Sequence, residues 1–108
     1  MNKDINEQRQ ELEDEIKKLG YQTLRYSLLC TQEEKREEWQ IRIDYENGKY
    51  YVYGLVDRAG LIGEKKEFAD FSLASAEFLD RLKHVVRYNQ LALENNMLTR
   101  YSSPLWDK

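Results

Sequence analysis

Cysteine, proline and histidine are all scarce in this chain of 108 residues, which has one of each. A single cysteine excludes an intrachain disulfide and is typical of proteins that fold in a reducing compartment. No apolar run approaches the roughly 18 residues that a membrane span requires. The N-terminal sequence is charged and is the opposite of a signal peptide, so we expect a cytoplasmic protein.

Positive charge is not in excess either, because 17 Lys and Arg residues stand against 20 Asp and Glu residues, giving a net charge of −3. Nucleic acids and anionic membranes bind clustered positive charge, so we expect neither as a partner. The length predicts one domain over residues 1–108. Aromatic residues make up 12% of the chain, which argues against disorder.

Two stretches have the apolar spacing of amphipathic helices. The first covers residues 3–19 and ends at Gly20, which we expect in the left-handed C-cap conformation. The second has Ser72 as its expected N-cap, Phe71 as a staple before it, and runs to about Glu94. The tail after it carries Trp106 and is expected to dock on the domain.

Alternating apolar and polar residues between these helices predict strands over 21–30, 38–46 and 49–56. Asn47-Gly48 is the strongest local signal for a two-residue type I′ turn, and such a turn determines the strand register. The expected opposing pairs are Tyr45 with Tyr50, Ile43 with Val52, Trp39 with Val56, Asp44 with Tyr51, Arg42 with Tyr53, and Gln40 with Leu55. Residues 31–37 and 57–70 are expected to be loops, the latter with an optional short strand around Leu61-Ile62.

The order of elements predicts an α+β fold with two layers. We expect an N-terminal helix, a three- to four-stranded antiparallel sheet and a long C-terminal helix, with both helices on one sheet face. The helices would cover Trp39, Ile41, Ile43, Tyr45, Tyr50 and Val52. The opposite face would display Thr23, Arg25, Gln40, Arg42, Asp44, Tyr51, Tyr53 and Leu55.

No catalytic, metal or cofactor constellation stands out. His84 and Cys30 are far apart in sequence, and we interpret them as a helix-surface residue and a small buried residue. Gly60 and Gly63 lack the rest of a phosphate-binding motif. Acidic pairs such as Glu33-Glu34 lie in a hydrophilic loop, where a solvated carboxylate is the simpler interpretation than a general acid or base.

The open sheet face is the candidate binding surface, because tyrosine and arginine are enriched at interface hot spots. The alternative is that tyrosines merely favour strands and pair well across them. Residues 31–38 and 3–19 each add a net charge of −2, which suits either solvation or a basic partner. The candidate partner-binding residues are Arg42, Asp44, Tyr51, Tyr53, Glu34, Glu37 and Glu38.

Four segments carry a family resemblance: Glu38-Trp39-Gln40-Ile41-Arg42-Ile43; Tyr51-Val52-Tyr53 leading to Asp57-Arg58-Ala59; Phe68-x-x-Phe71 into Phe78-Leu79-x-Arg81-Leu82; and Ser103-Pro104-Leu105-Trp106. Over residues 10–107 the chain resembles small cytosolic immunity proteins of bacterial polymorphic-toxin loci, of the kind found beside LXG-type toxins. The resemblance implies a non-enzymatic protein without cofactors that binds and neutralises the C-terminal domain of its cognate toxin. We expect it to be a monomer when free.

Two alternatives remain open at the level of sequence. The narrow apolar stripe of the first helix could pack on another chain, which would make the protein an adaptor or an oligomerising module. A small enzyme is the third possibility, and it requires a deep pocket that gathers Arg42, Tyr53 and an acid.

Overall fold

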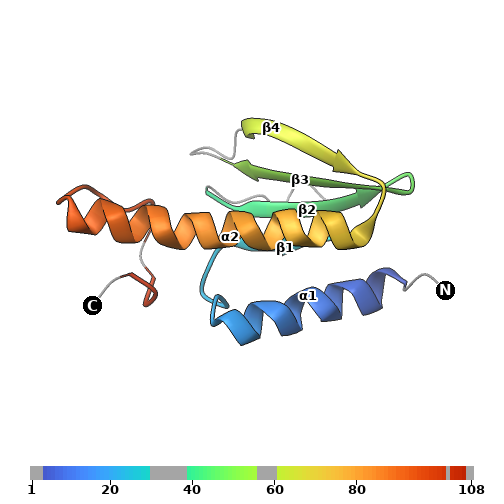
Figure 1. The fold of residues 1–108 in the computed structure, drawn as a ribbon, viewed down its shortest axis with the longest axis horizontal. Helices are drawn as coiled ribbons and strands as arrows, with labels where there is room; N and C mark the ends of the chain where they lie inside the picture. Colours follow the sequence, from blue (N-terminus) through green and yellow to red (C-terminus); the bar gives the residue numbers. More distant parts are fainter. Residues whose placement is uncertain (1–3, 30–38, 56–60, 102, 107–108) are drawn as a thin grey trace.

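The computed structural model describes residues 4–29, 39–55, 61–101 and 103–106. The elements are α1 (Ile5–Leu19), β1 (Tyr26–Leu28), β2 (Ile41–Glu46), β3 (Lys49–Leu55), β4 (Leu61–Phe68) and α2 (Phe71–Glu94). The strands form one four-stranded sheet in the order β1-β2-β3-β4. Helix α2 lies across the sheet, and α1 runs beside α2 (Figure 1). The predicted α+β fold is therefore confirmed.

Helix α1 forms where the apolar spacing predicts it. Asp4 is the N-cap and accepts a hydrogen bond from the Glu7 amide at 2.8 Å, and Gly20 ends the helix with φ 78°. Leu12 and Ile16 are fully buried in the core. Because its apolar stripe is narrow, the apolar packing of α1 on the domain is made by this one row of side chains.

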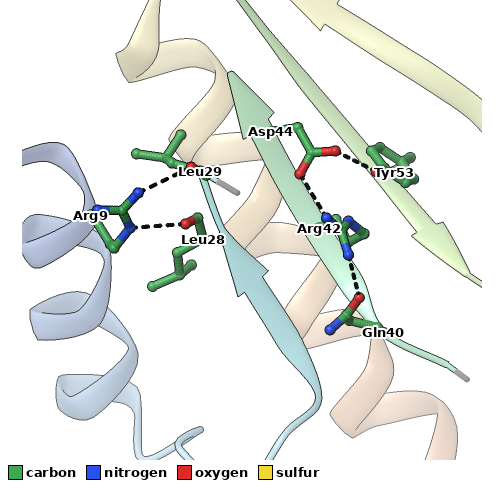
Figure 2. Close-up of polar contacts among 7 residues, drawn as sticks. All are labelled: Arg9, Leu28, Leu29, Gln40, Arg42, Asp44 and Tyr53. Carbon is green, nitrogen blue, oxygen red and sulfur yellow. Dashed lines mark hydrogen bonds and ion pairs between the residues drawn. The ribbon is translucent and has the colours of Figure 1, made fainter. Parts of the chain in front are cut away.

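Arg9 links α1 to the end of β1 by two hydrogen bonds. Its Nε donates to the Leu28 carbonyl and its Nη2 donates to the Leu29 carbonyl, both at 3.1 Å (Figure 2). Leu29 has φ 53° and its amide donates to the Ile43 carbonyl at 2.6 Å, so the chain turns there after β1. The guanidinium thus satisfies carbonyl groups at the point where the strand ends.

The β2–β3 hairpin confirms the predicted turn. Asn47 and Gly48 have φ of 52° and 79°, the positive values that a type I′ turn requires at both positions. The register pairs Tyr45 with Tyr50, Ile43 with Val52, Asp44 with Tyr51, and Arg42 with Tyr53, as predicted. Val56, the expected partner of Trp39, lies outside the described residues.

The first strand differs from the prediction in length and direction. Only Tyr26–Leu28 is strand, and it pairs parallel to β2, so the sheet is mixed rather than wholly antiparallel. A parallel pair needs a long crossover connection, and residues 29–40 separate the two strands. Residues 22–24 form a turn instead of the start of the strand.

The segment before α2, predicted to be a loop with an optional short strand around Leu61-Ile62, contains a fourth strand that is longer than this option. Leu61–Phe68 forms β4, which pairs antiparallel with β3 at the sheet edge, with a register irregularity between Val52 and Gly54. Charged side chains are common on edge strands because they prevent edge-to-edge pairing. Lys66 Nζ lies 3.7 Å from Oε1 of Glu77 in α2. Glu67 Oε2 accepts a hydrogen bond from Lys49 Nζ at 3.0 Å.

Helix α2 begins two residues earlier than predicted. Asp70, not Ser72, is the N-cap, and its side chain accepts from the Ser72 amide at 3.2 Å, which makes Phe71 the first helical residue. The helix ends at Glu94, as expected. Its buried stripe packs on the sheet, and the core includes Ala74, Phe78, Leu82, Val85, Val86, Ile41, Ile43, Tyr50 and Val52.

The tryptophans Trp39 and Trp106 have different outcomes. Trp39 has φ 62° and precedes β2, so the prediction that it extends the strand and faces the core is wrong. Trp106 is buried, and its ring packs edge-on against that of Tyr101 with 5.3 Å between the ring centres. Its Nε1 donates a hydrogen bond to the Tyr101 carbonyl at 2.8 Å. The tail is therefore docked, as predicted.

Candidate functional site

We call the side of β2 and β3 that faces away from α2 the polar face. Ile41, Ile43 and Val52 belong to the core beneath α2, and side chains alternate along a strand. In Figure 2 the polar side chains accordingly lie on the near side of β2, with α2 behind the sheet. The polar face consists of Gln40, Arg42, Asp44, Tyr51, Tyr53 and Leu55.

Most of this face is buried, which corrects the prediction that it is displayed. Arg42, Tyr53 and Leu55 are 1% exposed, and Gln40 is 2% exposed. Asp44 and Tyr51 are half-buried and retain contact with solvent. The strand pattern correctly predicted which residues share the face, but alternation alone carries no information on what covers it.

The buried side chains form one hydrogen-bonded network (Figure 2). Arg42 Nη1 donates to Gln40 Oε1 at 3.0 Å, and Arg42 Nη2 lies 3.4 Å from Asp44 Oδ1. The Tyr53 hydroxyl donates to Asp44 Oδ2 from the neighbouring strand. A buried guanidinium is tolerated only with an opposite charge and hydrogen-bond partners, and Asp44 and Gln40 supply both.

Lys65 of β4 lies over the two tyrosines of this face. Its Nζ is 4.7 Å from the centre of the Tyr53 ring and 5.3 Å from that of Tyr51, which is cation–π distance. Lys65 itself is exposed. Sequence analysis missed it because a run of four charged residues resembles a loop, and the alternation around it was too short to indicate a strand.

A second aromatic and cationic cluster lies near the C-terminal end of α2. The Arg100 guanidinium is 4.3 Å from the Tyr88 ring centre and 4.8 Å from that of Trp39. The Arg100 amide also donates to the buried Asn89 side chain at 2.8 Å. These contacts join Trp39, which lies shortly before β2, to the segment that follows α2, a long-range pairing with no local sequence signal.

The structure describes only some of the other residues that the sequence analysis considered for a site. Glu34, Glu37, Glu38 and Cys30, together with Glu33 and Gly60, lie outside the described residues. His84 is on the helix surface as predicted, 3.7 Å from Asp80. Within the described segments no three His, Cys, Asp or Glu residues converge to hold a metal ion. No helix in those segments is long and apolar enough to cross a bilayer.

Comparison with known families places the chain among the immunity proteins, the class that the sequence resemblance indicated. The family model that matches covers residues 5–107, almost the whole chain, and describes Immunity protein 59. The chain therefore belongs to the Immunity protein 59 family. No curated protein and no solved structure matches the chain.

Proposed function

We propose that this protein binds the C-terminal domain of a cognate secreted toxin in the producing cell and neutralises it by direct contact. Membership in an immunity protein family supports a toxin as the partner. The proposed contact surface is the polar face, centred on Asp44 and Tyr51. The observation that carries this choice is the network that holds the half-buried Asp44 carboxylate between Arg42 and Tyr53.

The network divides the candidate residues into two roles. Arg42 and Tyr53 are buried, so in this conformation they position Asp44 and offer little surface to a partner. Asp44 and Tyr51 are partly accessible, and exposed Lys65 lies over the Tyr51 ring. A carboxylate held in place by two partners loses little conformational entropy on binding, which favours affinity and specificity.

Charge and chemistry fit an occluding inhibitor. Neutralising a toxin requires a stable surface complementary to the partner and no reaction step, so we propose that the protein acts without a cofactor. Glu34, Glu37 and Glu38 remain proposed contacts that would extend the surface with negative charge. We further propose that the protein is cytoplasmic and is a monomer when free.

The two alternatives, an oligomerising module and a small enzyme, are less well supported by the structure. The apolar stripe of α1 that an oligomerising module would use is filled by its own core, because Leu12 and Ile16 are fully buried there. Arg42, Asp44 and Tyr53 do meet, as a small enzyme would require. They meet as a network in which Arg42 pairs with Asp44 and Tyr53 donates to the same carboxylate, so these groups are engaged with one another.

Titration calorimetry with the cognate toxin domain tests the proposal. Tyr51→Ala should weaken binding about 30-fold or more, the loss expected at a hot spot of about 2 kcal/mol. Tyr88→Ala is the matched control, because Tyr88 is an exposed tyrosine on α2, away from the polar face. Equal affinities for Tyr51→Ala and the unaltered protein would move the interface elsewhere, and no complex at all would overturn the function.

A further inference from the structure

A pocket of about 380 Å³ lies at the end of the molecule where both helices begin. In Figure 1 the N-terminal ends of α1 and α2 and the β2–β3 turn all lie at this end. The pocket is separate from the polar face, since its strand residues belong to the α2 side of the sheet. Its lining consists of Asp4, Ile5, Gln8, Tyr45, Gly48, Tyr50, Ala69, Asp70 and Phe71.

Three aromatic rings form one wall of this pocket. The Tyr45 and Tyr50 ring centres are 5.0 Å apart, and those of Tyr50 and Phe71 are 5.6 Å apart, all in tilted arrangements. Tyr50 is held in place because its hydroxyl donates to Gln8 Oε1 at 2.9 Å. Tyr45 and Phe71 are half-buried, so their rings keep surface for a ligand. Fixed aromatic rings attract cations and pack on aliphatic chains.

Two carboxylates, those of Asp4 and Asp70, also line the pocket. Asp4 and Asp70 are the N-caps of α1 and α2, and each uses its Oδ1 to accept a helix amide. In the described part of the chain neither Oδ2 has a hydrogen-bond or ion-pair partner. A helix N-terminus contributes roughly +0.5 charge, so each end remains negative after its aspartate is counted. Among the described residues that line the pocket, none is basic.

The side-chain amide of Gln8 adds a hydrogen-bond donor that suits a peptide ligand. Its side chain lines the pocket although the residue is only 5% exposed, and Oε1 is occupied by Tyr50. Its Nε2 has no hydrogen-bond partner among the described residues. This amide can therefore donate to a carbonyl oxygen, such as that of an incoming main chain. Acceptors and a donor thus lie within one cavity beside aromatic rings.

We propose that this pocket binds a lysine or arginine side chain of the partner, an inference that rests on the proposed function in taking the partner to be a protein. The aliphatic part of that side chain packs on Tyr45 and Phe71, and its cationic group reaches Asp4 and Asp70. Exposed Glu7, whose amide donates to Asp4, adds negative charge next to the pocket. The partner surface that faces this end of the molecule is therefore basic.

NMR titration of the full chain with N-acetyl-argininamide and N-acetyl-lysinamide tests the pocket without the toxin. Saturable amide shifts should be confined to Gly48, Asp70, Phe71 and their neighbours. N-acetyl-norleucinamide, which has the aliphatic chain but no charge, should bind at least about tenfold more weakly, because it lacks the charge-assisted hydrogen bonds. Stronger binding of N-acetyl-glutamic acid amide, or no localised shifts with either basic probe, would overturn the proposal.

The double variant Asp4→Ser and Asp70→Ser removes both charges while serine preserves the N-caps. It should lose binding of the basic probes by about tenfold or more. The control Asp14→Asn and Asp80→Asn removes two exposed charges from the same helices and should leave probe binding unchanged. Equal losses in both variants would indicate a general charge effect and overturn the site.

The two proposals fail in different measurements. If the toxin domain binds but the basic probes do not, the pocket proposal is wrong and the proposed function stands. If the probes bind at the pocket but the toxin domain does not bind the protein, the proposed function is wrong and the inferred partner falls with it.

Discussion

Arg42 Nη2 lies 3.4 Å from Asp44 Oδ1, two positions along the same strand, and the Arg42 side chain is 1% exposed while that of Asp44 is 13% exposed. Residues two apart on a strand point to the same face, so the pair needs no turn or helix to bring it together. The sheet therefore holds a charged pair at its surface boundary, with the cation buried and the anion partly accessible.

Replacing Arg42 with Met should lower the free energy of unfolding by about 3 kcal/mol, because it leaves the Asp44 carboxylate largely desolvated without its cation. Urea denaturation measures this change. The double variant Arg42→Met with Asp44→Asn should recover part of the loss, since no unpaired charge remains. Equal stability of the Arg42→Met variant and the unaltered protein would show that the pair does not matter for folding.

The hydrogen bond from Tyr53 to Asp44 is expected to stabilise the same network. Tyr53→Phe removes only the hydroxyl donor and should cost about 1 kcal/mol of unfolding free energy, because Asp44 loses one of its partners. Tyr88→Phe removes a hydroxyl from an exposed tyrosine and should change stability little. Identical urea midpoints for the two variants would contradict this assignment.

Core packing between α2 and the sheet should dominate stability. Ile43 is fully buried in the centre of β2, so Ile43→Ala should cost about 2–5 kcal/mol through lost burial and the cavity that remains. Leu98 is 93% exposed, and Leu98→Ala is the aliphatic control, with an expected change near zero. Thermal unfolding of both variants tests the contrast, which disappears if Ile43 is not a core residue.

Glu77 should make stability depend on acid pH. The hydrogen bond from Arg81, at 2.8 Å, together with the charges of Arg81 and Lys66, lowers the pKa of Glu77 against the opposing effect of desolvation. A carboxyl whose pKa is lower in the folded state than its ordinary value of 4.5 binds fewer protons when folded. Its stabilisation is therefore present above that value and is lost as the pH falls through the lowered pKa.

Glu77→Gln should accordingly reduce stability at pH 7 by about 0.5 kcal/mol, the usual worth of such a helix ion pair. It should also flatten the decline in stability below pH 4.5. Glu94→Gln, at an exposed position of the same helix, is the control. Parallel pH profiles for Glu77→Gln and the unaltered protein would rule out this role for Glu77.

The sequence alone determined the features whose signals are local. Asn47-Gly48 supplied the two consecutive positive φ values that a type I′ turn requires, and the strand register followed from the turn length. Gly20 ended α1 because a residue without Cβ enters the left-handed conformation at little cost. The pairing of Arg42 with Tyr53 and of Asp44 with Tyr51 followed from the same register. Each feature follows from a short sequence signal, either a helix cap or the two-residue turn that sets the register.

The tertiary structure decided what depends on distant segments. Alternation showed that Arg42 and Tyr53 share a face with Tyr51, but not that the first two are buried. The parallel direction of β1, the strand Leu61–Phe68 and the position of Lys65 over two tyrosines arise from pairing across the sheet. The pocket between Asp4 and Asp70 exists because both helices begin at the same end of the molecule. Packing brings such groups together only after the chain folds, so no spacing along the sequence indicates them.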